Sequence, residues 1–126
     1  MTFDIPDDRR YSETHEWAKP EGDTVTIGIS DFAQDELGDI VYIELPDDGE
    51  SITAGEPFGI IESIKAVNDL YAPISGTVVA RNDELFDAPE QINEAPYEAG
   101  WMVRIEPDDQ AELETLLSPS AYEERV

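Results

Sequence analysis

Short strand-like runs separated by strong turn signals are the feature that most constrains the fold of this chain. Residues 24–29 alternate polar or small residues with branched apolar ones, the pattern of a strand with one buried face. Residues 40–45 are also strand-like and lead into Pro46-Asp47-Asp48-Gly49, whose composition favours a turn. Further strand candidates lie at 58–64, 70–79 and 101–105, and an irregular acidic stretch is expected at 82–100. The sequence therefore predicts a mainly β fold.

Two helical segments are expected beside the strands. Asp31 and Gln34 have capping-box spacing, and Gly38 suits a C-terminal cap, so a short helix is predicted near 31–37. A second helix is predicted after Pro107, where Asp109 is followed by one apolar stripe. That stripe consists of Leu113, Leu116 and Leu117, and Ser118 followed by Pro119 can start another short helical turn.

Length and charge define the class of protein. A chain of 126 residues fits one domain, residues 1–126, with a single core. Hydrophobic residues make up 40%, too many for a disordered polyanion, although the formal net charge is -24. Such a charge repels nucleic-acid phosphates and anionic lipid head groups. We therefore expect an acidic folded domain that binds neither nucleic acid nor a membrane.

The same charge leads to a hypothesis about the surrounding solution. Self-repulsion weakens a compact state in dilute buffer, whereas at about 1 M salt the Debye length falls to about 3 Å. A salt-rich cytoplasm is therefore the hypothesis, and an acidic protein of an ordinary cytosol is its rival. The first ten residues lack the apolar region of a secretion signal, and no stretch has membrane-spanning length, so a cytoplasmic location is expected.

Lysine is rare in this chain, and its placement indicates chemistry. Only Lys19 and Lys65 occur beside five arginines, and Lys65 separates two strand-like runs, near the apex of an expected hairpin. Arginine serves a salt bridge equally well, but only a lysine amine can lose its proton and form an ordinary amide. The chain has no cysteine, so it offers no thiolate nucleophile, disulfide or cysteine-based metal site, and any redox group must be imported. Lys65 is thus predicted to be a modified lysine.

The residues around Lys65 carry a resemblance. Glu62-Ser63-Ile64-Lys65-Ala66 resembles the attachment motif of lipoyl-carrying proteins. Other segments narrow the match to the H-protein family of the glycine cleavage system, in order from Tyr11 to Tyr122. They are Thr14-His15-Glu16-Trp17, Gly38-Asp39-Ile40-Val41, Glu44-Leu45-Pro46, Ser75-Gly76, Asn93-Glu94-Ala95-Pro96-Tyr97 and Gly100-Trp101.

The resemblance implies a fold, a cofactor and partners. It implies a flattened barrel or sandwich of two small antiparallel sheets, the lipoyl/biotinyl-carrier-like hybrid motif, with residues 24–106 as the lipoyl-binding core. Lipoate is expected in amide linkage to Lys65. The implied partners are the pyridoxal-phosphate glycine decarboxylase (P protein), the tetrahydrofolate-dependent aminomethyltransferase (T protein), the flavin dihydrolipoyl dehydrogenase (L protein) and a lipoate-attaching enzyme. The chain is then a shuttle for the aminomethyl group of glycine and not an enzyme.

Further site residues follow from the resemblance. It places Thr14, Glu16 and Asp69 in the cleft that receives the loaded arm, where anionic acceptors suit an amine. Thr14 replaces the serine often found there and adds a methyl group. Glu62 is either part of an acidic surface or a contact for the lipoate-attaching enzyme. The sole histidine, His15, is interpreted as a packing residue because no nucleophile or metal ligand accompanies it.

Alternative functions differ in what they require of Lys65. A lipoyl relay, or a carrier serving another oxoacid dehydrogenase complex, keeps the same modification. A Schiff-base enzyme needs a desolvated lysine with a lowered pKa, unlike a lysine at an exposed turn. A purely structural acidic domain needs no modification, so the mass of the native protein separates the last two classes from a carrier.

Overall fold

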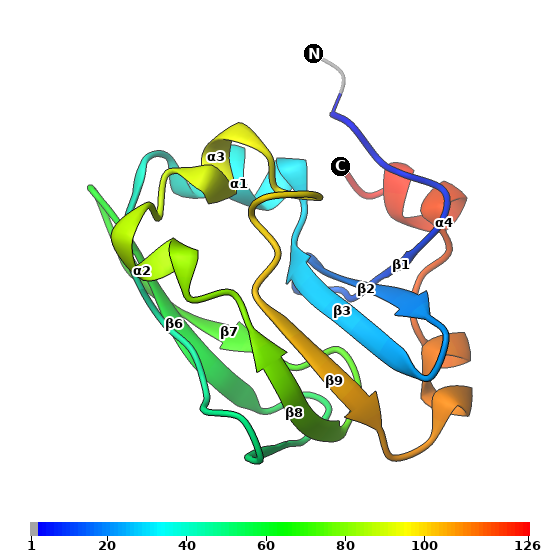
Figure 1. Cartoon of the computed structure of the whole chain (residues 1–126). Helices are drawn as coiled ribbons and strands as arrows, with labels where there is room; N and C mark the ends of the chain where they lie inside the picture. The colour runs from blue at the N-terminus through cyan, green and yellow to red at the C-terminus, as the bar shows by residue number, and fades with distance from the viewer. Residues whose placement is uncertain (1–2) are drawn as a thin grey trace.

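A computed structural model describes residues 3–126 of the chain (Figure 1). The sheet-forming elements are β1 (Arg10–Tyr11), β2 (Glu16–Glu21), β3 (Thr24–Ile29), β4 (Ile40–Glu44), β5 (Ser51–Ile52), β6 (Pro57–Ser63), β7 (Val67–Tyr71), β8 (Gly76–Arg81) and β9 (Val103–Pro107). The helical elements are α1 (Asp31–Leu37), α2 (Glu84–Asp87), α3 (Gln91–Glu94), the 3-10 helix η1 (Gln110–Thr115) and α4 (Pro119–Glu123). Within this described range, no helix has the length and apolarity to cross a membrane.

The strands form two antiparallel sheets. One has six strands in the order β1-β2-β3-β9-β8-β5, and the other has three in the order β4-β6-β7. Every strand pair is antiparallel. Figure 1 shows the β6–β7 hairpin extending to the left of the molecule, while α4 lies on the opposite side. The prediction of a mainly β fold with two antiparallel sheets is confirmed, as an open sandwich and not a closed barrel.

Apolar side chains from both sheets meet in one core. Val25 and Ile27 of β3 lie opposite the β9 residues in the first sheet, while Ile43 and Ile61 come from the second, and all four are essentially inaccessible to solvent. The face of β3 that the alternation predicted to be buried is buried, but the opposite face is buried as well, since Thr26 is only 5% exposed. A second cluster consists of Tyr11, Trp17 and Tyr122, at the side of the molecule where β1 and α4 lie.

Helix α1 begins and ends close to the predicted residues, but its cap differs. The expected capping role of Asp31 is wrong, because Ser30 is the N-cap and its hydroxyl accepts a hydrogen bond from the Ala33 N–H. Asp31 is the first helical residue and accepts from the Gln34 amide instead. Gly38 ends the helix with φ of 81°, a conformation that favours glycine.

The C-terminal segment is helical in two pieces. Asp109 caps η1, a 3-10 helix, by accepting a hydrogen bond from the Ala111 N–H, and Ser118 caps α4, in which proline occupies the first turn. The expected capping box at Asp109 is not formed, because the Glu112 carboxylate accepts from the Ser75 N–H at 2.9 Å. Leu113 and Leu116 nevertheless pack on the main core, so the predicted apolar stripe has the expected role.

Three strand boundaries differ from the sequence-based expectation. Strand β7 begins at Val67, so the hairpin turn is shorter than the interruption expected at 65–69. The single candidate 70–79 divides into β7 and β8, and the last strand is β9 rather than 101–105. The stretch 82–100 contains the short helices α2 and α3 and is not wholly irregular.

Candidate functional site

Lys65 lies in the turn of the β6–β7 hairpin. The Ser63 N–H donates to the Ala66 carbonyl at 2.9 Å, and the Lys65 N–H donates to the Ser63 hydroxyl at 3.3 Å. Ile64, on one side of Lys65, is 71% exposed, and Val67 is 66% exposed. The turn is therefore closed by local hydrogen bonds, while its side chains face solvent.

The Lys65 amine is free of ion pairs with any residue in 3–126. Lys19, by contrast, lies 3.6 Å from the Asp8 carboxylate and 3.7 Å from the Glu21 carboxylate. A free amine at an exposed turn is open to an enzyme that carries an activated acyl group, because no electrostatic partner has to be displaced. These are the surroundings expected of an acylation site rather than of a structural salt bridge.

A side chain from α3 holds the segment on which the hairpin rests. The Asn93 amide donates to the Gly38 carbonyl at 2.9 Å and accepts from the Ile40 N–H at 2.9 Å. Between these two residues, the Asp39 carbonyl accepts from the Ile64 N–H at 3.0 Å. Asn93 therefore fixes the backbone that anchors the residue preceding Lys65.

Replacing Asn93 with alanine should loosen this hairpin selectively. The change leaves the Gly38 carbonyl and the Ile40 N–H without their partner, which costs about 1–3 kcal/mol of unfolding free energy. We expect faster hydrogen exchange at the Ile64 amide, measured by NMR on the unmodified protein. The matched control is Asn82→Ala, which removes hydrogen bonds to the Ala99 and Trp101 carbonyls, remote from the hairpin. Equal effects of the two variants on the Ile64 amide would contradict the anchoring role.

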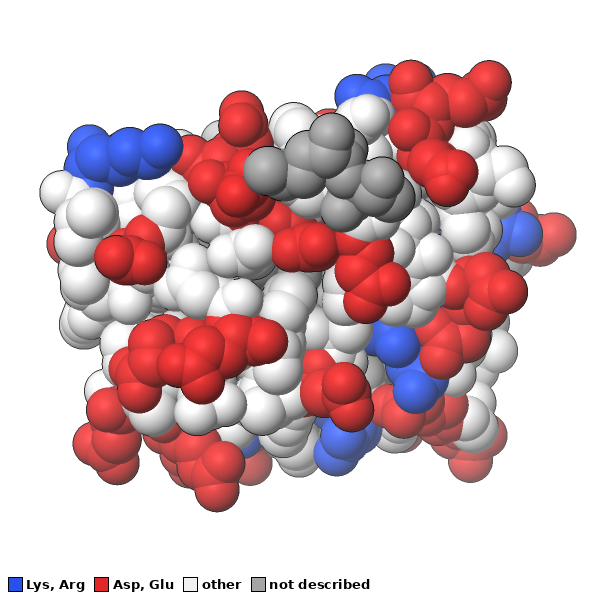
Figure 2. Space-filling view, turned by 90° about the horizontal axis from the view of Figure 1, so that it is seen from above, with Lys and Arg blue, Asp and Glu red and all other residues white. Residues whose placement is uncertain are grey.

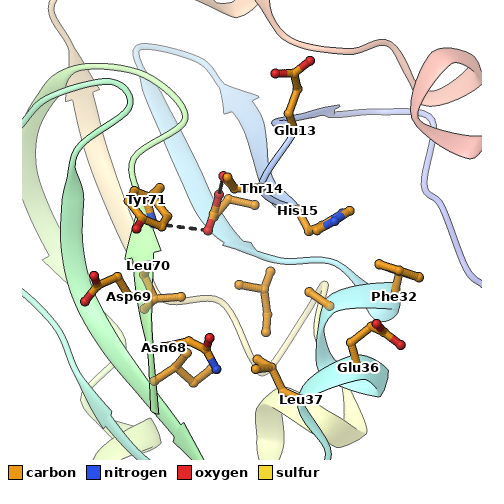
Figure 3. A pocket seen from close by; sticks show the side chains of 14 residues that line it. Glu13, Thr14, His15, Phe32, Glu36, Leu37, Asn68, Asp69, Leu70 and Tyr71 are labelled. Atoms are coloured by element: carbon orange, nitrogen blue, oxygen red, sulfur yellow. Dashed lines mark hydrogen bonds between the residues drawn. The ribbon is translucent and has the colours of Figure 1, made fainter. Parts of the chain in front are cut away.

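A cleft of about 420 Å³ lies between β7 and α1 (Figure 3). The segment Glu13–Glu16 closes one end, and the apolar lining includes Ile29, Ile61 and Leu70. The cleft thus joins residues from the first sheet, the second sheet and α1. Of the predicted site residues, it brings together Thr14, Glu16 and Asp69.

Glu16 is a buried carboxylate in the cleft, only 3% exposed. One of its oxygens accepts from the hydroxyls of Ser12, at 2.8 Å, and Thr14. The other accepts from the Tyr71 N–H at 3.2 Å, so Glu16 connects the two sheets across the cleft (Figure 3). Burial raises the pKa of the Glu16 carboxyl above its ordinary value, and the three donors oppose that rise. A buried carboxylate of this kind suits a cationic amine, because the opposite charge strengthens the hydrogen bond between them.

Asp69 and its neighbour Asn68 point in different directions. Asn68 faces into the cleft, whereas the Asp69 carboxylate points away from it, although its residue lies on the rim (Figure 3). The register explains the difference, because Asn68 pairs with buried Ile61 while Asp69 pairs with Ile60. Asn68 was missed by the sequence reasoning. The two-residue alternation signals its position, since it shares a face with buried Leu70.

Glu62 lies outside the cleft. It is partly buried in β6, with Tyr42 and Val67 as its cross-strand neighbours. Glu62 and Lys65 are therefore close in sequence on one hairpin, but Glu62 does not share the cleft with Thr14 and Glu16.

His15 packs among aromatic side chains. Its Nδ1 lies 2.8 Å from the Tyr122 hydroxyl, and its ring centroid is 4.8 Å from that of Phe32. Burial lowers the pKa of the His15 imidazole, so the ring is neutral near pH 7. The interpretation of His15 as a packing residue agrees with these contacts.

Comparison with known proteins identifies the family of this chain. The model of the glycine cleavage H-protein family matches residues 9–126. The chain is 59% identical, over 100% of its length and 99% of the relative's, to a probable glycine cleavage system H protein of Haloarcula marismortui. It is 60% identical to a glycine cleavage system H protein of a Geobacillus species, with 98% of each chain covered.

A solved structure gives the same result in three dimensions. The crystal structure of a glycine cleavage system H protein from Mycobacterium marinum superposes with a TM-score of 0.88 at 40% sequence identity. The match covers 96% of this chain and 98% of the other. A match of family model, sequence and fold over nearly the whole length leaves one conclusion: this chain belongs to the glycine cleavage H-protein family.

Proposed function

We propose that Lys65 is the lipoylated residue through which this carrier of the glycine cleavage system moves an aminomethyl group from the decarboxylase to the aminomethyltransferase. The observation that carries the proposal is the exposed Lys65 amine, which is free of ion pairs with residues 3–126. Lys65 lies in the turn between β6 and β7, and both strands contribute residues to the cleft. Residues 24–106 form the lipoyl-binding core of a single domain. The chain itself acts as a carrier and not as an enzyme, in the cytoplasm of a salt-adapted organism.

The partners in this proposal are the P, T and L proteins and a lipoate-attaching enzyme. Each must reach the arm on Lys65, and the exposed side chains of Ile64 and Val67 leave the turn accessible to all four. Glu62, in the same hairpin, is proposed as a contact of the lipoate-attaching enzyme. A surface of net charge -24 favours partners with basic contact surfaces.

The hairpin and the cleft together fit a lipoyl-lysine. Lipoate supplies the dithiol/disulfide pair that this cysteine-free chain lacks. Strand β7 leads from the turn to the cleft, and its four residue steps span roughly 13 Å, comparable to an extended lysine with a lipoyl chain. The cleft residues therefore lie where the tip of such an arm can be held.

Inside the cleft, this chain supplies a buried carboxylate beside an apolar wall. The exposed Thr14 donates its hydroxyl to Glu16, and Ile29, Ile61 and Leu70 belong to the apolar lining. Asp69, with its carboxylate turned away, contributes a negative charge at the rim. Together these groups retain an amine on the arm until the transferase takes it.

Replacing Glu16 with glutamine should therefore shorten the lifetime of the cargo, the aminomethyl group on the lipoyl arm. A hydrogen bond to a charged group contributes about 1.5–3 kcal/mol, so we expect ammonia and formaldehyde to leave the loaded protein about 10- to 100-fold faster without the transferase. Asp69→Asn should have a smaller effect that fades in high salt, since it acts across solvent. Lipoate attachment to Lys65 should be unchanged in both variants.

The matched control is Glu13→Gln, which removes the same charge from an exposed residue at the cleft entrance. Its carboxylate points away from the cleft (Figure 3), so release should stay at the original rate. The protein is loaded from glycine by the decarboxylase. Failure of the unsubstituted lipoylated protein to load would contradict the carrier function, whereas normal loading with equal release rates in all variants would contradict only the cleft assignment.

A further inference from the structure

The hydroxyl of Tyr122 lies outside the cleft lining, in contact with His15 and Ser30. Tyr122 belongs to α4, is fully buried, and is 107 residues from His15 in the sequence. Its hydroxyl is 2.6 Å from the Ser30 hydroxyl and 2.8 Å from His15 Nδ1. Ser30 caps the helix that forms one wall, and His15 lies between Thr14 and Glu16. One phenol group from a remote helix therefore contacts both segments.

The Tyr122 hydroxyl can bond to both neighbours at once. Burial raises the pKa of Tyr122 to about 12, so the phenol keeps its proton. The neutral imidazole of His15 has one donor and one acceptor nitrogen, and Nδ1 faces the phenol. The phenol therefore either donates to Nδ1 and accepts from Ser30, or accepts from Nδ1 and donates to Ser30, whose oxygen also accepts the Ala33 N–H. In both arrangements Tyr122 bonds to His15 and to Ser30.

The His15 backbone needs such a restraint. His15 has φ of 75°, in the left-handed region that a residue with a side chain rarely adopts. A strained residue of this kind persists only where the surrounding contacts hold it in place. Its carbonyl accepts from the Ser30 N–H at 3.0 Å, and its N–H donates to the Ser12 carbonyl at 3.1 Å. The resulting turn directs His15 away from the β7 wall of the cleft (Figure 3).

We propose that the Tyr122 hydroxyl is a positioning group for the cargo-holding cleft. By holding His15 and Ser30 together, it sets where Glu16 lies relative to the Tyr71 N–H, although it touches neither the arm nor the cargo. The role rests on the proposed function of the cleft. It extends the functional residues to a C-terminal helix that lines no part of the cavity.

The chain offers a closely matched control. Tyr11 stacks on Tyr122, with ring centroids 4.5 Å apart and an angle of 6° between the rings, and it is equally buried. Its hydroxyl, however, donates to the Pro6 carbonyl at 2.6 Å, away from His15 and Ser30. Tyr122→Phe and Tyr11→Phe each remove one hydroxyl and keep the stacked rings. Only the first removes the contact with the cleft walls.

The first measurement uses protein without lipoate. Because His15 is the sole histidine, its imidazole titrates without overlap in NMR spectra. Tyr122→Phe should shift the His15 pKa by up to about one pH unit, since the ring loses its hydrogen-bond partner at Nδ1. The charged groups that influence His15, Glu36 and Arg125, are the same in both variants. The Tyr71 amide, which donates to Glu16, should also exchange its hydrogen faster.

The second measurement uses the loaded protein. Tyr122→Phe should accelerate release of the amine about three- to tenfold, and Tyr11→Phe should leave it unchanged. An unchanged His15 pKa and Tyr71 amide in Tyr122→Phe, or equal changes in both variants, would overturn the positioning role. Failure of the unsubstituted protein to retain cargo, with the His15 and Tyr71 effects present, would instead count against the proposed function.

Discussion

Lys65→Arg is expected to abolish lipoate attachment while leaving the fold intact. The substitution keeps the positive charge at an exposed turn, so no packing is lost. A guanidinium remains protonated and cannot attack an activated acyl group, so the required amide does not form. The measurement is intact mass and peptide mass after incubation with lipoate, ATP and a lipoate ligase. The same measurement on protein from its native host should find one lipoyl group on Lys65 of the unsubstituted chain.

Lys19→Arg is the control for the loss of a lysine. Lys19 is paired with Asp8 and Glu21, and an arginine can keep both ion pairs, so labelling should remain complete. Undiminished labelling of Lys65→Arg would contradict the assigned site. Full labelling of the unsubstituted protein with no loading from glycine would instead favour a lipoyl carrier of another complex.

The second large effect is expected from salt. Acidic residues cover much of the face seen in Figure 2, with only isolated basic groups between them. The net charge of -24 remains after every lysine and arginine is counted, including those in the seven ion pairs among residues 3–126. At about 1 M salt the repulsion acts over only about 3 Å. We expect the unfolding free energy to rise by several kcal/mol, a large share of the usual 5–15 kcal/mol.

Urea unfolding measures this effect as a shift of the midpoint between dilute buffer and molar potassium chloride. A parallel series with a chloride salt of a larger cation tests whether screening alone is responsible. Screening predicts equal shifts at equal ionic strength, and the shift should saturate in the molar range. A midpoint that stays constant across both series would contradict the high-salt hypothesis and leave the function of Lys65 untouched.

Sequence patterns correctly predicted the elements that are determined by residues close together in the chain. The alternation at 24–29 and the turn at 46–49 each act within a few residues, and β3 and the end of β4 lie where these signals place them. Strand β2 had no such signal. It begins with Glu16, which is buried, and contains Lys19 and Pro20 in the positions paired with Thr26 and Val25 of β3. Only tertiary hydrogen bonds make a glutamate acceptable at a core position.

The cleft could not be built from sequence spacing. Glu16 and the Tyr71 N–H that it accepts from are 55 residues apart and belong to different sheets. The resemblance named Thr14, Glu16 and Asp69, and the structure brings these three residues to one cavity. The resemblance could not supply the direction of each side chain, because consecutive residues of β7 point to opposite faces of the sheet. Asn68 was therefore overlooked, and the contact between Tyr122 and His15 has no sequence signature at all.

Strand β7 is an edge strand of its sheet, a position that favours aggregation at high protein concentration. An outermost strand exposes backbone donors and acceptors on which a strand of another molecule can assemble. In this chain the Tyr71 N–H is already occupied by the Glu16 carboxylate, which lies along that edge. A strand from another copy of this chain would have to displace the buried Glu16 carboxylate. It would also approach a molecule with the same net charge of -24. Glu16, the residue proposed to hold the amine, thus also blocks one backbone donor of this edge strand.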